Sequence, residues 1–237
     1  MPPRIVRPPR TRRELLKLTP LLGLGAVLHA PWRASILDAG VRWSDWVSGR
    51  TFRGAHLAPT YSDADLVPFE RFPYNYYDIL EPEIDFGAWA LQVNGRVSKP
   101  GKYTLDRIQA LEKVSHNTRH VCVEGWDAIG SFGGARLGDF LDFVGAAPDA
   151  RYVSVTCADQ YYESIDMAMA RHPQTLLCYE MYGRPLDRGH GAPLRLQMPT
   201  TIGYKQAKYL LTLSVVDALG PEQSFWGDQG YSWHGGI

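Results

Sequence analysis

The chain has 237 residues, and its 12% content of Trp, Tyr and Phe argues against a disordered protein. Its formal charge is zero, but residues 1–30 hold six of the 25 basic side chains and only one of the 25 acidic ones. The other 19 basic and 24 acidic side chains give a net charge of −5, which offers no electrostatic surface for nucleic acid. We therefore expect one domain of about 200 residues with a sizeable core and no nucleic-acid partner.

The amino terminus reads as a targeting segment. A basic stretch ends in the pair Arg12-Arg13, and an apolar run from Leu18 to Leu28 follows, too short to span a bilayer comfortably. This pattern is typical of a twin-arginine export signal over residues 1–30, although a basic tail with two adjacent arginines is the alternative. Cleavage after Ala30 and retention as a membrane tether both stay open. Because this route exports folded proteins, the signal predicts a periplasmic protein that receives a bulky cofactor before export.

Residues 31–87 are predicted as an aromatic-rich extension, with a short helix up to Phe52 and then a long ordered loop that is dense in Pro, Asp and Tyr. The alternating stretch Ala88–Val93 predicts a strand that reaches Asn94-Gly95, a pair typical of short hairpin turns. Further strands are expected at 117–124, 151–156, 160–165, 175–181, 194–198 and 209–216. Short helices are expected at 104–111, 137–144 and 166–171. Short strands mixed with short helices predict a single α+β domain over 88–237.

Cys122 is the candidate centre of the chemistry, because it lies near the end of the predicted strand 117–124. Its thiolate could be a nucleophile or a ligand for a soft, redox-active metal, and a buried structural cysteine is the plain alternative. The sequence has no phosphate-binding glycine fingerprint, no Cys-x-x-Cys pair, no zinc helix, no nucleophile elbow and no haem-attachment motif. A metal bound here would therefore take most of its coordination from something other than the protein.

Three segments resemble the molybdopterin-binding domain of the sulfite oxidase family: Arg119–Trp126, Leu186–Arg195 and Pro199–Lys208. The resemblance extends in order over about residues 88–217 and is most specific in the run that ends in Pro-Leu-Arg195 and in the Lys-x-x-Lys pair behind it. It implies a sulfite-oxidase-type fold of mixed β-sheets with short helices. It also implies an oxidoreductase that carries a molybdenum–molybdopterin cofactor and transfers oxygen atoms, similar to small exported sulfoxide-reducing members of the family.

The resemblance also implies the residues of the site. In the family one cysteine thiolate binds molybdenum, and Cys122 matches that ligand. The positions that match cofactor contacts are Asn75, Tyr77, Asp78, Cys157, His190, Arg195, Gln206, Ala207 and Lys208. The fork of Arg195 can bind phosphate oxygens bidentately, whereas a solvated surface lysine is the alternative for Lys205 and Lys208. A disulfide between Cys157 and Cys178 is an equal alternative to a cofactor contact.

Substrate residues are predicted near the cysteine. Arg119, three residues before Cys122, is a catalytic candidate that could hold an anionic or oxo-bearing substrate, with Trp126 and Tyr161 as walls of the pocket. The several arginines that surround sulfite in sulfite oxidases are missing as a set. Reduction of a sulfoxide or related oxide is therefore the first expectation and oxidation of sulfite the second.

Two other classes of function stay open from the sequence. One is a hydrolase or transferase with Cys122 as nucleophile and His116, His120 or His190 as base. The other is an exported binding domain without a metal. For the favoured oxidoreductase we expect a small-molecule substrate, a monomer, and a separate electron partner, either a membrane haem protein or a soluble cytochrome.

Overall fold

The structure is a computed structural model that describes residues 32–51, 56–76 and 81–237. The predicted export signal lies outside these residues, as do Tyr77 and Asp78. Two units separate along the chain, Met1–Ser44 and Asp45–Ile237. The helix α2 (Trp32–Thr51) crosses this boundary and agrees with the predicted amino-terminal helix. Within the described residues, no helix combines the length and apolar character that crossing a membrane requires.

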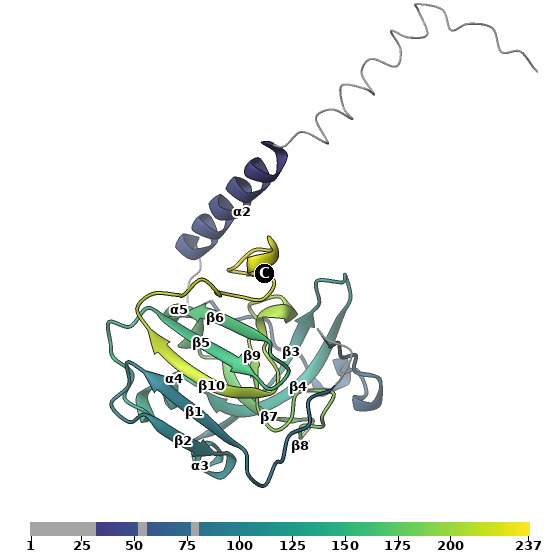
Figure 1. Cartoon of the computed structure of the whole chain (residues 1–237). Coiled ribbons are helices and arrows are strands. Elements are labelled where there is room, and N and C mark those ends of the chain that lie inside the picture. The colour runs from purple at the N-terminus through teal and green to yellow at the C-terminus, as the bar shows by residue number, and fades with distance from the viewer. Residues whose placement is uncertain (1–31, 52–55, 77–80) are drawn as a thin grey trace, which may run out of the picture. The chain divides into compact units, whose positions relative to one another are not determined.

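Two five-stranded sheets form the body of the unit Asp45–Ile237 (Figure 1). The first sheet has the order β2-β1-β10-β5-β6 and is mixed, because β1 and β10 run parallel and its other pairs are antiparallel. Its strands are β1 (Ala90–Gly95), β2 (Gly101–Thr104), β5 (Tyr152–Cys157), β6 (Tyr162–Asp166) and β10 (Leu210–Val216). The second sheet has the order β3-β4-β7-β8, with β9 also paired to β7, and is antiparallel. Its strands are β3 (Lys113–Val121), β4 (Asp127–Arg136), β7 (Leu176–Met181), β8 (Arg184–Pro185) and β9 (Arg195–Gln197).

The helices of this unit are short and buried on one face. They are α3 (Leu105–Gln109), α4 (Leu137–Phe143) and α5 (Met167–Ala170), with 3-10 turns η1 (Asp63–Asp65), η2 (Phe69–Arg71), η3 (Gly203–Lys205) and η4 (Gly227–Gln229). The carboxylate of Asp166 caps α5 by accepting a hydrogen bond from the Met169 amide at 2.7 Å. One large core cluster takes side chains from both sheets, among them Val93 and Leu196, which are fully buried. The predicted α+β class with mixed sheets is confirmed.

Three strands, β2, β4 and β8, were not predicted. The strand β4 escaped prediction because it contains Gly130, Gly133 and Gly134, and glycine is depleted in strands. The structure explains Gly130: a Cβ atom there would lie 2.6 Å from the ring of Phe72, so the glycine lets Phe72 pack on the strand. The predicted turn at Asn94-Gly95 is wrong in position. Both residues continue β1 beside β10, and the chain reverses only after them, before β2 begins.

The segment 56–76, part of the predicted ordered loop, belongs to the body of the fold. The Tyr61 amide donates to the Asn117 carbonyl on β3, and the Val67 amide donates to the Ile129 carbonyl on β4, both at 3.0 Å. An isolated bridge joins Thr60 to Thr118. These bonds lay the segment along the second sheet and bring its end, residues 72–76, to the loop that carries Cys122.

Candidate active site

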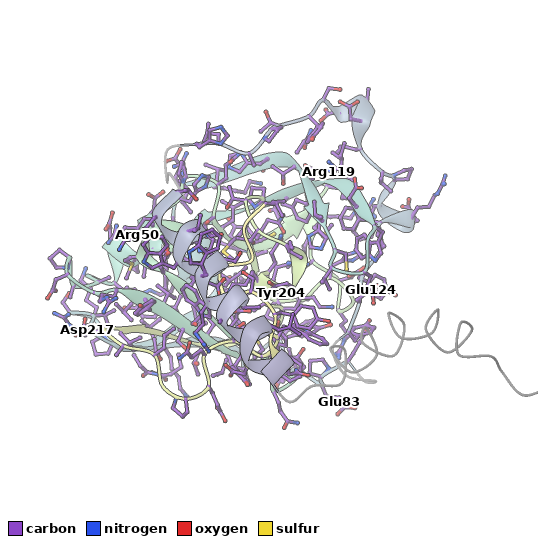
Figure 2. The ribbon with its side chains drawn as sticks, turned by 90° about the horizontal axis from the view of Figure 1, so that it is seen from above. Arg50, Glu83, Arg119, Glu124, Tyr204 and Asp217 are labelled. Carbon is purple, nitrogen blue, oxygen red and sulfur yellow. The ribbon has the colours of Figure 1, made fainter. Side chains whose placement is uncertain are left out.

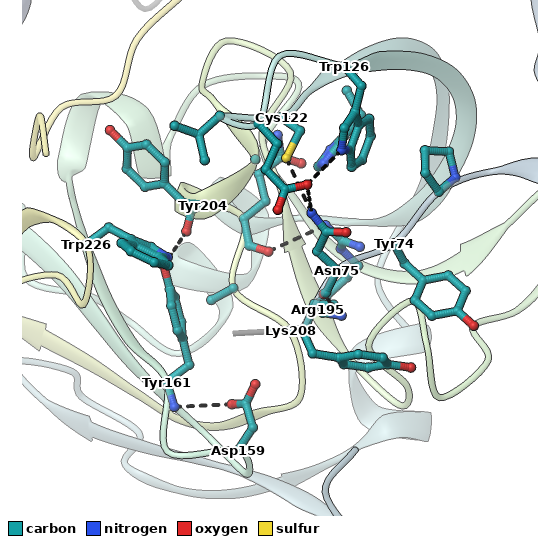
Figure 3. A pocket seen from close by; sticks show the side chains of 18 of the residues that line it. Tyr74, Asn75, Cys122, Trp126, Asp159, Tyr161, Arg195, Tyr204, Lys208 and Trp226 are labelled. Carbon is teal, nitrogen blue, oxygen red and sulfur yellow. Dashed lines mark hydrogen bonds between the residues drawn. The ribbon is translucent and has the colours of Figure 1, made fainter. Parts of the chain in front are cut away.

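Several segments of the unit Asp45–Ile237 enclose a cavity: residues 72–76, the end of β3 with the β3–β4 loop, the β5–β6 turn, the start of β9, the stretch that contains η3, and Trp226 (Figure 3). Its lining includes Phe72, Tyr74, Asn75, Tyr76, His120, Cys122, Glu124, Trp126, Asp159, Tyr161, Arg195, Tyr204, Gln206, Ala207, Lys208 and Trp226. In Figure 3, Cys122 and Trp126 lie at the upper end and Asp159 at the lower end. The cavity therefore collects residues that are more than 100 positions apart in the sequence.

Cys122 is the first residue after β3 and opens the five-residue loop to β4. Its amide donates to the Trp126 carbonyl at 2.9 Å, and the Gly125 amide donates back to the Cys122 carbonyl at 3.1 Å. Gly125 adopts a φ of +92°, a conformation that glycine reaches without strain. The predicted strand 117–124 therefore stops earlier than expected, and a closed turn, not the strand itself, presents the thiol to the cavity.

The thiol of Cys122 is surrounded by polar side chains. The Asn75 amide group donates to Cys122 Sγ at 3.7 Å and to Glu124 Oε2 at 2.6 Å, while Trp126 Nε1 donates to the same carboxylate oxygen at 3.1 Å. Burial, and further the nearby Glu124 charge, raise the pKa of Cys122, although backbone amides and Asn75 oppose the shift. Without a positive partner, the thiol is held in its protonated form at neutral pH.

Arg195 lies deep in the cavity as a buried cation. Its guanidinium donates to three carbonyl oxygens, those of His190 at 3.1 Å, Leu196 at 3.2 Å and Gln206 at 3.4 Å. Burial lowers the pKa of Arg195. No carboxylate of the described residues forms an ion pair with it, so a full positive charge faces the cavity without an anion.

Lys208 is the second cation, and together with Arg195 it forms what we call the basic floor of the cavity. Its ammonium donates to the carbonyls of Asn75 at 2.7 Å and Gly189 at 2.9 Å and lies 4.5 Å above the ring of Tyr76. Burial, and next the charge of Arg195, lower the pKa of Lys208 to about 7. An anion bound at the floor would reverse this shift.

Two glycines make room around the basic floor. Gly191 has a φ of +101°, and a Cβ atom there would lie 2.8 Å from Lys208 Cβ. A Cβ atom on Gly203 would lie 2.7 Å from Nε2 of His120. Burial, and next the charge of Arg195, lower the pKa of His120 to about 3, so its imidazole is neutral. The glycines thus permit close packing of cations and imidazole at this end of the cavity.

Gln206 and Ala207 form the turn beside the floor. The Gln206 amide donates to the Gly203 carbonyl at 3.0 Å, and its side-chain amide donates to the carbonyls of Met198 and Thr201, both at 3.1 Å. Gln206 therefore shapes the turn from within, while Ala207 lines the cavity beside it. The resemblance implies phosphate contacts from the backbone amides of these positions, and in this structure the Gln206 amide is engaged with Gly203.

His190 lies behind the cavity wall and does not line it. Its Nδ1 contacts Asp187 Oδ1 at 2.6 Å, and its ring packs 5.0 Å from that of Tyr74. Its Nε2 is buried without a hydrogen-bond partner in the part of the chain that the structure describes. Burial lowers the pKa of His190, against the raising effects of Asp187 and of a backbone hydrogen bond with Phe72.

Besides His190, two further predicted residues are not brought to the cavity. Arg119 pairs with Asp127 at 2.7 Å, and both side chains are largely exposed (Figure 2). It points away because side chains alternate along β3, and its neighbour His120 takes the cavity face. Cys157 is buried in the core of the first sheet and is absent from the lining. The disulfide alternative is wrong in this structure, since Cys157 and Cys178 are both free thiols.

Several residues of the cavity escaped the sequence reasoning. Glu124 stands in the motif around Cys122, two positions after it, and its carboxylate could have been noticed as a neighbour of the thiol. Asp159, Tyr204 and Trp226 carry no such signal, because they come from separate segments that only the fold brings together. The neutral His120 was considered only as a base for a nucleophilic thiol.

Residues 79–226 match the family described as oxidoreductase molybdopterin binding domain. The chain belongs to this family. It is 44% identical over 204 residues to the putative protein-methionine-sulfoxide reductase subunit YedZ1 of Azospira oryzae, an alignment that covers 85% of this chain and 76% of the relative. It is 32% identical over 244 residues to the protein-methionine-sulfoxide reductase catalytic subunit MsrP of Xanthomonas campestris, covering 91% and 73%.

The fold also has a solved counterpart. The sulfane dehydrogenase SoxCD from Paracoccus pantotrophus superposes with a TM-score of 0.54 at 20% identity, over 58% of this chain and 40% of that one. This likeness shows the fold alone. Together with the family match, it confirms the sulfite-oxidase-type molybdopterin-binding fold, and the family identifies the protein as an oxidoreductase.

The residues of the cavity fit the cofactor of this family. Arg195 is a buried cation and Lys208 a partly buried one, and among the described residues neither forms an ion pair with a carboxylate, although Asp159, Glu81 and Asp187 lie near enough to raise the pKa of Lys208. A phosphate group would add the directly bound anion that these two cations lack. Among residues 32–51, 56–76 and 81–237, no group of three His, Cys, Asp or Glu side chains could hold a metal ion by itself. A cofactor that brings its own donors therefore suits this cavity.

Proposed function

We propose that the chain is the catalytic subunit of an exported molybdenum-cofactor oxidoreductase that reduces sulfoxides, with methionine sulfoxide in proteins as its substrate. The relatives whose names carry this activity align over 85% and 91% of the chain. The observation that carries the proposal is a single cavity with the Cys122 thiol at one end and the unpaired basic floor deeper inside.

In this arrangement Cys122 Sγ would be the protein's ligand to molybdenum, and Arg195 and Lys208 would hold the phosphate of the pterin. The bound cofactor supplies two-electron oxygen-atom transfer, which this chain's side chains cannot perform. Lys208 would gain a full charge on binding phosphate, because its pKa of about 7 leaves part of the amine neutral beforehand. The thiol must lose its proton to become a ligand, and a cation beside it favours that loss.

The substrate side of the cavity suits a neutral, polarisable group. Trp126, Tyr161 and Trp226 provide aromatic walls, against which a thioether or sulfoxide sulfur can pack. Asn75 and the indole of Trp126 are N–H donors beside Cys122, so they could orient a sulfoxide oxygen. The Glu124 carboxylate accepts hydrogen bonds from both donors and so fixes their direction. Reduction of the sulfoxide to a thioether and water consumes two electrons and two protons.

Charge at the cavity disfavours the sulfite alternative. The lining cations are Arg195 and Lys208, both in the basic floor, and the side chain next to Cys122 that carries charge is Glu124. Arg119, the residue predicted to hold an anion, pairs with Asp127 outside the cavity. An anionic substrate would therefore be repelled by the carboxylate next to Cys122. A neutral sulfoxide would not be repelled by it.

The nucleophilic alternative meets a similar obstacle. A catalytic thiol needs a lowered pKa or a base within hydrogen-bond reach, whereas burial raises the pKa of Cys122. No hydrogen bond joins Cys122 Sγ to His116, His120 or His190, and His120 has a pKa of about 3. The neighbour that does reach the sulfur is the amide group of Asn75.

Export and electron supply complete the proposal. The twin-arginine pattern in residues 1–30 supports a periplasmic location, and the electrons would come from a separate protein, such as a membrane haem protein or a soluble cytochrome. The sequence has no haem-attachment motif of its own.

The decisive experiment measures cofactor and turnover in protein purified from the periplasm of a native host. We expect close to one equivalent of molybdenum and a fluorescent pterin released on denaturation. With a reduced artificial mediator, the protein should reduce free and peptide-bound methionine sulfoxide and should leave sulfite unoxidised. Sulfite oxidation as the faster reaction would refute the substrate assignment, and an active protein free of molybdenum would refute the whole proposal.

A further inference from the structure

Lys205 is a fully buried cation that the site described above does not use. Its neighbours Tyr204 and Gln206 line the cavity, but Lys205 points the other way and is completely shielded from solvent. Its ammonium donates to Glu163 Oε1 at 2.5 Å and to the Ser164 carbonyl at 2.8 Å. The alternative of a solvated surface lysine is therefore wrong for this residue.

The ion pair of Lys205 and Glu163 joins three separate parts of the chain. Glu163 lies on β6, and Lys205 ends η3. The other carboxylate oxygen, Glu163 Oε2, accepts a hydrogen bond from the Ser224 hydroxyl at 3.0 Å. The Lys205 ammonium also lies 4.9 Å above the ring of Trp233. Ser224 and Trp233 belong to the carboxy-terminal segment, residues 224–237, so this segment rests on the pair.

The same segment runs along the residues that lead into the turn of the basic floor. The Ile202 amide donates to the Gly235 carbonyl at 2.8 Å, and the Ile237 amide donates to the Thr200 carbonyl at 3.1 Å. The Tyr204 hydroxyl donates to the Ser232 carbonyl at 2.7 Å. Residues 200–204 are thus tied to residues 232–237 immediately before the chain turns into Gln206, Ala207 and Lys208.

A second anchor holds the carboxy-terminal segment in place. Asp45 accepts hydrogen bonds from the Ser232 hydroxyl at 2.5 Å, the Trp233 amide at 3.1 Å and the His234 amide at 3.0 Å. Trp233 Nε1 donates to the Ser164 hydroxyl, next to Glu163, at 2.9 Å. The ring of Trp233 is therefore fixed from both sides over the Lys205 ammonium.

A buried ion pair is an expensive way to stabilise a fold, because desolvation of both charges offsets most of their attraction. Burial lowers the pKa of Lys205 and raises that of Glu163, which records this cost on both partners. An apolar pair of similar volume would stabilise the fold at least as well. What the charged pair adds is a fixed geometry with several directed contacts to β6, η3 and the carboxy-terminal segment.

We propose that Lys205 is a positioning residue for the cofactor. The Lys205–Glu163 pair couples the docked carboxy-terminal segment to the turn from Gly203 to Lys208, so this segment sets how tightly the phosphate of the cofactor is held. The inference rests on the proposed function, in which Arg195 and Lys208 bind that phosphate. Lys205 touches neither the cofactor nor the substrate and acts through the backbone of its own turn.

The test compares rates of cofactor release from intact, loaded protein. The principal variant is the double substitution Glu163→Gln with Lys205→Met, which avoids a lone buried charge. A matched control is Ile108→Ala on α3, a fully buried core residue that does not line the cavity. Each protein is incubated well below its Tm, and the released pterin is followed by its fluorescence while the remaining molybdenum is measured per protein.

We expect release from the double variant to be about tenfold faster or more, the range seen when residues that orient a ligand are replaced. The Ile108→Ala control should release pterin at the wild-type rate although its Tm is lowered as much or more. Equal release from the double variant and wild type would overturn the inference. So would faster release from the control in proportion to its Tm, because stability alone would then govern retention.

Trp233→Phe keeps the inference testable if the double variant does not fold. It removes the hydrogen bond to Ser164 and weakens the contact with Lys205, and we expect release about threefold faster, the effect of one hydrogen bond. An unchanged rate would count against the coupling. The failure of the proposed function looks different: wild-type protein would then contain no pterin to release, whereas failure of this inference alone leaves wild type and variants equally loaded.

Discussion

The two ends of the cavity are built in opposite ways. At the Cys122 end, the polar groups of Asn75, Glu124 and Trp126 are partly exposed and bond to one another. At the basic floor, Arg195 is buried and Lys208 is partly buried, and their hydrogen bonds go to backbone carbonyls, with no carboxylate of the described residues bonded to either cation. At the first end the polar groups satisfy one another's hydrogen bonds, whereas the second end holds two positive charges that a phosphate would neutralise. Binding and chemistry are therefore separable, and substitutions at the two ends should have different consequences.

Cys122→Ser should have the largest effect on turnover. A hydroxyl is a harder donor than a thiolate and stays protonated, so the proposed bond to molybdenum would be lost. We expect sulfoxide reduction to fall on the order of a hundredfold or more, while pterin content falls much less because the basic floor is intact. Steady-state assays and pterin quantification on the same preparation check this. Activity at the wild-type level would show that Cys122 is not the ligand to molybdenum.

Cys122 and the basic floor could be predicted because they lie in contiguous motifs. The run around Cys122 and the stretch from Gly191 to Lys208 each keep their residues close in sequence, and a local pattern reports them. The strand β4 was missed because glycines that admit Phe72 and the neighbouring strand lower its strand propensity.

Other wrong predictions concern the direction in which a side chain points and its contacts with residues distant in the sequence. Arg119 is predicted to hold the substrate because it lies only three residues before Cys122. The alternation of side chains along β3 turns it to the opposite face, where Asp127 pairs with it. Lys205 and Lys208 have the same side chain and lie in one motif. One is buried against Glu163 and the other faces the cavity, a difference that depends on residues more than 40 positions away.

Lys208→Met should change the pH dependence of stability in the cofactor-free protein. The pKa of Lys208 is about 7 in the folded state, below its ordinary value of 10.5. Between these values the unfolded chain binds more protons than the folded one, so the free energy of unfolding of wild type rises with pH by up to about 1.4 kcal/mol per unit. Below about pH 7 the ammonium is charged in both states, and its burial cost is fully present.

The variant should lose that rise, and the two proteins should differ most at pH 6. Urea unfolding at pH 6 to 9, with wild type and Lys208→Met side by side, measures the difference between the two slopes. In loaded wild type the slope should be smaller, because the phosphate keeps Lys208 protonated in the folded state. Parallel curves for the two cofactor-free proteins would show that the basic floor carries no unbalanced charge.

Glu124→Gln should change activity and stability least of the three substitutions. It tests, from the Cys122 end, whether binding and chemistry are separate. Glutamine keeps an oxygen that can accept from Asn75 and Trp126, so the loop should retain its shape. The Glu124 charge helps to raise the pKa of Cys122, although burial is the larger cause, so its removal should lower that pKa modestly. The rate of alkylation of cofactor-free protein by iodoacetamide, followed against pH, reports the thiolate fraction and should shift to lower pH.

Pterin retention in loaded protein should stay at the wild-type value, since the basic floor is untouched. If retention fell together with the thiol pKa, the two ends of the cavity would be coupled, and the separation of binding from chemistry would be wrong.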